Sequence, residues 1–266
     1  MITSSLFADP RTGQRLGNQL FQLAALLGLA IRYDTQLLLP DRWRYKQSFC
    51  LHPRIVWGSA KADYALQEPG FACHLDFFDA HAEEISSRCV DIHGFLQSEK
   101  YWKAAEKDIR SALSFRPEIK EAVQSILKQN GIDAESTTAI SVRRGDFCTD
   151  ANHVLLPASY YENAYYHYFP NSPICFFSDD CKWCEENLSH LSHEAFSAEA
   201  LSPILQLACL SRFHRFVIAN STFSWWGAYL SESKDKVVVR PARHFCGALA
   251  DTDISDHYPE AWLVEA

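Results

Sequence analysis

Residues 138–146 read TAISVRRGD: five residues that suit a strand, followed at once by two arginines, a glycine and an aspartate. The run 138–142 is short and largely apolar, which predicts a buried β-strand. Its abrupt end in charged residues is typical of parallel α/β sheets, because loops at the carboxyl ends of such strands carry the ligand-binding groups. The stretch therefore indicates an α/β fold with a polar site at this strand end.

The same sequence of strand and polar end occurs twice more along the chain. A strand expected over 174–177 stops at a Ser-Asp-Asp segment, and one expected over 215–219 stops at Asn-Ser-Thr. Helices are expected over 157–168, 203–211 and 223–230, with a further strand over 236–240. Since parallel strands share one carboxyl edge, the three polar ends predict one shared pocket.

The first half of the chain shows the alternation in weaker form. A helix is expected over 17–31, a strand over 36–40, and helical structure over 99–129 with a new start at Pro117. We expect an α/β protein with two Rossmann-like halves, residues 1–115 and 116–245, that face each other across a cleft. The tail 246–266, with Trp262, is expected to pack back on the first half.

The composition of the 266 residues is globular, with 47% hydrophobic and 22% charged residues. The net charge of −8 argues against a nucleic-acid partner, because phosphate backbones need a basic face. Nine scattered cysteines predict reduced thiols in the cytoplasm. Cys181 and Cys184 form a lone CxxC without a matched second pair, so a zinc site is not expected.

Targeting signals are not evident in the sequence. The start, MITSSLFADP, lacks the basic residues and apolar core of a signal peptide. The longest apolar run, 23–31, is too short to span a bilayer. We expect a cytoplasmic protein, and peripheral contact with a membrane stays open.

The arginine pair suits the binding of a diphosphate. One guanidinium can fork onto phosphate oxygens, and the other can be held by a carboxylate such as Asp146. Gly145 would allow a tight turn or a close approach to a ligand. A surface salt bridge is the alternative interpretation.

The segment 220–227, NSTFSWWG, gathers hydroxyl groups at an expected helix start. Hydroxyls and free backbone N–H groups at such a start make a phosphate cradle. Phe223, Trp225 and Trp226 are expected as apolar walls, and Gly227 as a site of close packing. A plain helix cap with core aromatics would explain the hydroxyls and the rings separately.

Four segments, RLGNQLFQLA, SVRRGDF, FFSDD and ANSTFSWWGAYL, together resemble the bacterial α-1,2-fucosyltransferases of glycosyltransferase family 11, from about residue 13 to about residue 240. The resemblance implies a GT-B-like fold, with an N-terminal acceptor-side domain and a C-terminal GDP-sugar domain. It implies GDP-fucose as donor substrate, a β-galactoside glycan as acceptor, no cofactor and no essential metal. The family's HxRRGD motif corresponds to 141–146, so Ser141 replaces its histidine.

The resemblance also implies roles for individual residues. Arg144 is the first choice for contact with the β-phosphate of the donor, with Arg143 as the alternative, and Asn18 lies on a loop that reaches the reacting centre. The Ser-Asp-Asp segment would meet guanine, and the hydroxyls of the Asn-Ser-Thr segment would face phosphate. The implied donor-binding residues are Gly17, Asp146, Ser178, Asp179, Asp180, Asn220, Ser221, Thr222, Phe223 and Ser224.

The implied reaction is an inverting transfer of L-fucose from GDP-fucose to the 2-hydroxyl of a terminal β-galactoside. Departure of GDP places charge on its β-phosphate, which fixed hydrogen-bond donors stabilise. No carboxylate identifies itself as the base for the acceptor hydroxyl. The alternatives are transfer of another nucleotide-linked sugar and a non-catalytic sugar-nucleotide- or glycan-binding relative, which Ser141 favours.

Overall fold

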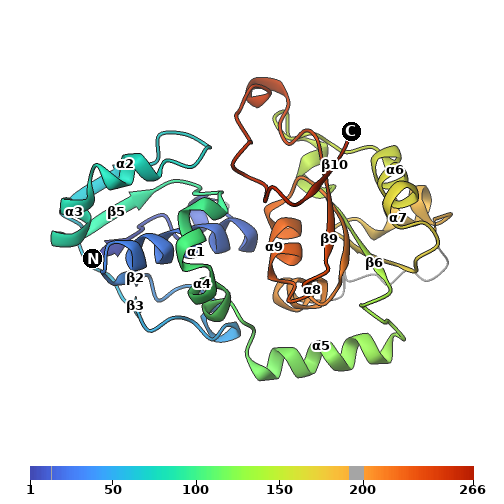
Figure 1. The fold of residues 1–266 in the computed structure, drawn as a ribbon, viewed down its shortest axis with the longest axis horizontal. Helices are drawn as coiled ribbons and strands as arrows, with labels where there is room; N and C mark the ends of the chain where they lie inside the picture. The colour runs from blue at the N-terminus through green and yellow to red at the C-terminus, as the bar shows by residue number, and fades with distance from the viewer. Residues whose placement is uncertain (13, 192–200) are drawn as a thin grey trace. The chain divides into compact units, whose positions relative to one another are not determined.

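The computed structural model describes residues 1–12, 14–191 and 201–266. They form two compact units. Unit 1 comprises Met1–Arg116 with Asp253–Pro259, and unit 2 comprises Pro117–Thr252 with Glu260–Ala266. Each unit has its own parallel sheet with helices packed against it (Figure 1).

Unit 1 is built on a five-stranded sheet with the strand order β3-β2-β1-β5-β4. Neighbouring strands are all parallel, so their carboxyl ends lie at one edge. β2 confirms the strand predicted over 36–40, whereas the other four were not predicted. The strands are β1 (Ile2–Thr3), β2 (Leu37–Leu39), β3 (Ile55–Trp57), β4 (Tyr64–Gln67) and β5 (Val90–His93).

The long helix of unit 1, α1 (Leu16–Arg32), confirms the helix predicted over 17–31. Most of it is buried, because apolar side chains occupy most of its circumference. At Gly28 a Cβ would lie 2.7 Å from the Cβ of Trp102, so glycine permits close packing on η3 (Glu99–Ala105). The shorter helices are η1 (Pro10–Thr12), η2 (Lys46–Ser48), α2 (Leu75–Asp79), α3 (Ala82–Ser87) and α4 (Glu106–Ala112).

Unit 2 has a second parallel sheet with the strand order β10-β9-β8-β6-β7. The strand predicted over 138–142 has those same bounds in β6, and three other predicted strands agree within one residue at each end. The short strand β10 was not predicted. The strands are β6 (Thr138–Val142), β7 (Ile174–Ser178), β8 (Arg215–Ile218), β9 (Val237–Pro241) and β10 (Leu263–Glu265).

Helices cover both faces of the unit 2 sheet (Figure 1). Ile140 and Val142 of β6 pack into a core with α6 (Ala158–Tyr168) and α7 (Cys181–Leu188) on one face. On the other face lie α8 (Pro203–Leu210) and α9 (Thr222–Leu230). The unit also contains α5 (Pro117–Gln129), η4 (Gly145–Cys148) and η5 (Gly247–Leu249).

The tryptophans of α9 belong to the hydrophobic core. Trp225 and Trp226 are fully buried, so the prediction that they wall a ligand pocket is wrong. Gly227 does serve close packing, because a Cβ there would lie 2.2 Å from Cδ2 of Leu210 in α8. Trp262 packs against Trp225, with ring centroids 5.4 Å apart, and belongs to unit 2, whereas Asp253–Pro259 of the same tail belongs to unit 1.

The cysteines are free thiols throughout the chain. Cys181 and Cys184 are buried in α7, and burial raises the pKa of the Cys184 thiol to about 11. Among the helices of the described residues, none has both the length and the apolar character needed to cross a bilayer.

Candidate active site

The three predicted polar segments of unit 2 lie at one edge of its sheet. β6 lies between β7 and β8 and is parallel to both. The register pairs Val142 with Ser178 and Ser141 with Ile218, so the loops that follow the three strands leave the sheet at similar heights. The chain order reverses between β6 and β8, and ligands of open α/β sheets bind at the carboxyl edge of such a switch point.

Arg143 is held by two carboxylates. Its Nη1 donates to Oδ2 of Asp179 at 2.5 Å, and its Nη2 donates to Asp146. Gly145 makes the first contact possible, because its φ is +27° and a Cβ there would lie 2.4 Å from Oδ2 of Asp179. The prediction that a carboxylate such as Asp146 anchors one arginine therefore describes Arg143.

Arg144 has a different environment. Its backbone N–H donates to Oδ1 of Asp179 at 2.9 Å, while its guanidinium lies over the ring of Trp183, 4.4 Å from the ring centre. Among the described residues Arg144 has no carboxylate partner, and its Nε is buried without a hydrogen-bond partner. A half-buried cation without a counter-charge suits an anionic ligand.

Both aspartates of the Ser-Asp-Asp segment have partners within the protein. Asp179 contacts Arg143 and the backbone of Arg144 in the turn of residues 143–146, here called the arginine turn. Asp180 is the N-cap residue of α7, and its Oδ1 accepts the N–H of Trp183 at 3.0 Å. Oγ of Ser178 accepts the N–H of Asp180 at 2.9 Å. The implied contact of these carboxylates with guanine stays a prediction, and in the structure they shape the site.

The start of α9 lies at the end of β8. Ser221 is its N-cap residue and makes no side-chain capping hydrogen bond. Ser221, Thr222 and Phe223 are half-buried, whereas Ser224 is buried. The first N–H groups of a helix have no partner within the helix and carry partial positive charge, so this end favours an anion.

The side chains of Ser224 and Asn220 make hydrogen bonds that join neighbouring elements at this edge of the sheet. Oγ of Ser224 lies 2.7 Å from Oγ of Ser141, a buried hydrogen bond between α9 and β6. Nδ2 of Asn220 donates to the carbonyls of Val154 and His244 at 3.1 and 2.8 Å, which joins two loops. Ser224 and Asn220 are thus positioned to orient the site.

The implied residues of unit 1 lie in the first turn of α1. Gly17 is buried, and Oδ1 of Asn18 accepts a hydrogen bond from Nε2 of Gln97 at 3.2 Å. Gln22, one turn later, donates to the carbonyl of Gly94 at 2.8 Å. The start of α1 is therefore joined to the loop after β5.

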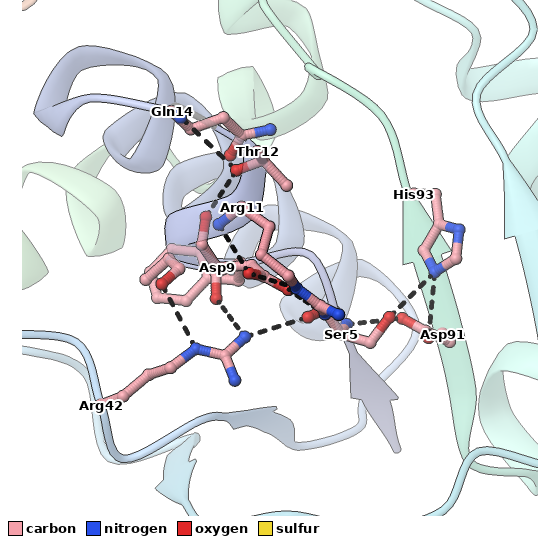
Figure 2. Close-up of polar contacts among 10 residues, drawn as sticks. Ser5, Asp9, Arg11, Thr12, Gln14, Arg42, Asp91 and His93 are labelled. Carbon is pink, nitrogen blue, oxygen red and sulfur yellow. Dashed lines mark hydrogen bonds and ion pairs between the residues drawn. The ribbon is translucent and has the colours of Figure 1, made fainter.

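Sequence reasoning missed a polar cluster in unit 1. Ser5, Asp91 and His93 contact one another at the carboxyl ends of β1 and β5 (Figure 2). The available signal was the sequence VDIH, in which two polar residues alternate with two apolar ones. Across the described ranges, no group of three or more His, Cys, Asp or Glu residues is placed to hold a metal ion.

A known family matches nearly the whole chain. The sequence model of glycosyl transferase family 11 covers residues 3–263. The chain belongs to glycosyl transferase family 11.

Curated proteins related to this family 11 chain include two from Escherichia coli. The O-antigen biosynthesis glycosyltransferase WbnK is 35% identical over 42% of this chain and 40% of its own length. An α-1,2-colitosyltransferase is 26% identical over 65% of this chain and 62% of its own length. The chain thus spans less than two thirds of the length of either relative. A galactoside 2-α-L-fucosyltransferase of Caenorhabditis elegans is 26% identical over 93% of this chain and 76% of its own length.

Two solved structures have a fold similar to that of this chain. A glycosyl transferase family 9 structure from Veillonella parvula has a TM-score of 0.58 at 9% identity, covering 99% of this chain and 84% of its own. POFUT1 in complex with GDP-fucose has a TM-score of 0.56 at 14% identity, covering 85% of this chain and 95% of its own. The two parallel sheets and these likenesses confirm the predicted GT-B-like α/β fold.

Proposed function

We propose that this family 11 chain transfers L-fucose from GDP-fucose to the 2-hydroxyl of a terminal β-galactoside, with inversion at the transferred carbon. The names of the relatives support a sugar transfer that forms an α-1,2 linkage. One observation carries the donor half of the proposal. A guanidinium without a carboxylate partner, that of Arg144, and the start of α9 follow the adjacent strands β6 and β8.

These two groups suit the diphosphate of the donor. The guanidinium of Arg144 binds phosphate oxygens in a fork, and the N–H groups at the start of α9, with the hydroxyls of Ser221 and Thr222, bind further oxygens. Both are fixed before the donor arrives, since Arg144 is stacked on Trp183 and Ser224 of α9 is bonded to Ser141. Fixed donors of this kind stabilise the charge that develops on the β-phosphate as GDP departs.

Arg143 and Asp179 act through the arginine turn. The ion pairs to Asp179 and Asp146 neutralise Arg143, and the contact from Asp179 to the N–H of Arg144 sets the path of the turn. The exchanged assignment, with Arg143 on the phosphate, is supported by strand alternation. Arg143 follows Ser141 by two residues, and Ser141 faces α9.

The remaining parts of the proposal concern the acceptor and the place of action. Residues 1–115 are the acceptor-side domain and residues 116–245 the GDP-sugar domain, with Asn18 orienting the acceptor. No metal is required, because the arginine and the helix start supply positive charge to the diphosphate. The protein works in the cytoplasm, in peripheral contact with a membrane that carries a lipid-linked acceptor.

A second donor sugar is favoured by one observation. A relative that aligns over 65% of this chain is named for transfer of colitose rather than fucose. The alternative is therefore GDP-colitose with the same acceptor hydroxyl and the same diphosphate contacts.

The test is a panel of donors with one β-galactoside acceptor. We expect release of GDP from GDP-fucose to depend on the acceptor, with slower turnover of GDP-mannose and UDP-galactose. Faster turnover of GDP-colitose than of GDP-fucose would replace the sugar but keep the site. Binding of GDP without turnover of any donor would favour a non-catalytic sugar-nucleotide-binding protein.

A further inference from the structure

Unit 1 has its own switch point at the carboxyl edge of its sheet. β1 is the central strand, with β2 and β3 on one side and β5 and β4 on the other, so the chain order reverses between β1 and β5. Such an edge is where open α/β sheets place ligands. The side chains found there are Ser5, Asp91 and His93.

These three residues form a connected set (Figure 2). Oδ1 of Asp91 accepts the N–H of Ser5 at 2.8 Å, and Oδ2 lies 3.0 Å from Nε2 of His93. The same Nε2 lies 3.2 Å from Oγ of Ser5. Asp91 and His93 are two residues apart in β5 and so point to the same face of the sheet.

Nε2 of His93 faces two oxygens, Oδ2 of Asp91 and Oγ of Ser5. A carboxylate cannot donate, so the contact with Asp91 favours the form of the imidazole that carries its proton on Nε2 and leaves Nδ1 as the basic nitrogen. Nδ1 makes no hydrogen bond to any described residue, and Figure 2 shows it pointing away from the cluster. The His93 side chain is 29% exposed.

The loop after β5 carries an exposed aromatic residue, Phe95, two positions after this histidine. Phe95 is 51% exposed, although the next residue, Leu96, is buried. Glu68 fixes the loop: it accepts the N–H of Leu96 at 3.0 Å and the hydroxyl of Tyr101 at 2.8 Å. A Cβ on Gly94 would lie 2.5 Å from Oε2 of Glu68, so the loop needs glycine there.

The loop after β1 is fixed as well, by Arg42 (Figure 2). Its Nη2 donates to the carbonyls of Ser5 and Phe7 at 3.0 and 3.1 Å, and its Nε donates to that of Ala8 at 3.3 Å. Three hydrogen bonds from Arg42 therefore hold the loop that contains Ser5. Both loops at this edge are therefore held by hydrogen bonds within the protein, and such preorganisation lowers the cost of binding a ligand.

The other carboxylates of this edge are committed elsewhere. Asp9 is paired with Arg11, whose hydrogen bonds hold the pKa of the Asp9 carboxyl far below its ordinary value. Glu68 is buried behind the loop. Asp91, Glu68 and the Asp9–Arg11 pair are the charged groups of β5, the end of β4 and the loop after β1. Each carboxylate has a partner within the protein: His93 for Asp91, Leu96 and Tyr101 for Glu68, and Arg11 for Asp9.

We propose that His93 is the proton acceptor for the acceptor hydroxyl, with Asp91 as its positioning residue and Phe95 as the surface for the apolar face of the acceptor sugar. This inference rests on the proposed transfer. The hydroxyl oxygen forms a bond to the anomeric carbon of fucose as the bond from that carbon to the β-phosphate oxygen breaks. GDP leaves with the electron pair, and the hydroxyl proton passes to Nδ1 of His93, which becomes an imidazolium ion paired with Asp91.

The experiment compares His93→Asn, Asp91→Asn and a matched control, His52→Asn, by kcat and kcat/KM across pH. His52 also neighbours an aspartate, Asp108, at 4.0 Å, but it precedes β3 and so lies at the amino edge of the same sheet. General-base groups typically contribute about 10²–10⁴-fold, so we expect His93→Asn to lower kcat by about 10²-fold. The pH profiles of kcat/KM should also differ between the wild type and His93→Asn, because the variant has no imidazole to take up the hydroxyl proton.

Asp91→Asn should also lower kcat, because an amide no longer fixes the Nε2–H form, while His52→Asn should keep both the rate and the pH profile. Affinity for GDP should stay within about twofold in all three, since its proposed ligands belong to unit 2. Phe95→Ala should weaken binding of a β-galactoside, seen by saturation-transfer NMR without any donor. If wild-type transfer occurs and His93→Asn keeps its rate and pH profile, His93 is not the proton acceptor. If the wild type binds GDP-fucose but transfers nothing, the proposed function itself is wrong.

Discussion

Removing the carboxylate of Asp179 should destabilise unit 2 and disorder its arginine turn. In Asp179→Ala the chain loses the contact to Nη1 of Arg143 at 2.5 Å and the contact to the N–H of Arg144 at 2.9 Å. Buried hydrogen bonds to charged groups contribute about 1.5–3 kcal/mol each, and exposed ion pairs under about 1 kcal/mol. Asp179 is 29% exposed, so we expect a loss of about 2 kcal/mol in the free energy of unfolding.

The assay is thermal unfolding with and without GDP, followed by calorimetry of GDP binding. About 2 kcal/mol corresponds to a fall in Tm of about 4–8 °C for a unit of this size. The matched control is Asp180→Ala, which removes only the cap of α7, and such caps are worth about 1 kcal/mol. Guanine binding by Asp179 predicts the opposite pattern: an unchanged Tm with a large loss of GDP affinity. That result would refute the structural role.

The remaining predictions concern the arginines, a metal and a buried carboxyl. Arg144→Ala should lower kcat by about a hundredfold or more without rescue by Arg144→Lys, whereas Arg143→Ala should mainly lower Tm; the reverse pattern would exchange their roles. EDTA should leave turnover unchanged, and recovery only on adding Mn²⁺ would contradict this. Burial raises the pKa of the Glu68 carboxyl above its ordinary value of 4.5, so folding favours its protonated form and the linked stability is lost as pH rises through the raised pKa. Relative to Glu68→Gln, the wild type should therefore gain Tm as the pH is lowered through this raised pKa, and parallel Tm curves for the two proteins would contradict the prediction.

The strands of unit 2 were predictable because local chemistry decides them. Residues 138–142 and 174–178 are buried on both faces, and runs of apolar side chains bounded by polar residues are the expected pattern of central parallel strands. In unit 1 the central strand has two residues, and β5 carries an aspartate and a histidine. Neither gives an apolar run, so their place in a sheet follows from tertiary packing.

The candidate site was predictable by position but not by contact. The sequence indicates three strand ends at one edge, and β6, β7 and β8 are neighbours. The partner of Asp179, in contrast, is 36 residues away along the chain, and Ser141 and Ser224 are 83 residues apart. Such contacts depend on the packed fold. The burial of Trp225 follows for the same reason, because a helix sequence alone does not tell which aromatic rings face the core.

The most direct test of the proposed transfer is the structure of its product. Wild-type protein is incubated with GDP-fucose and a terminal β-galactoside, and the purified product is examined by NMR. We expect one added fucose with the anomeric configuration α, attached at O2 of galactose. An α-linked fucose at another oxygen would correct the acceptor position, and a β-linked fucose would exclude the inverting displacement. Absence of any transferred sugar, with folded protein that binds GDP, would contradict the proposed function.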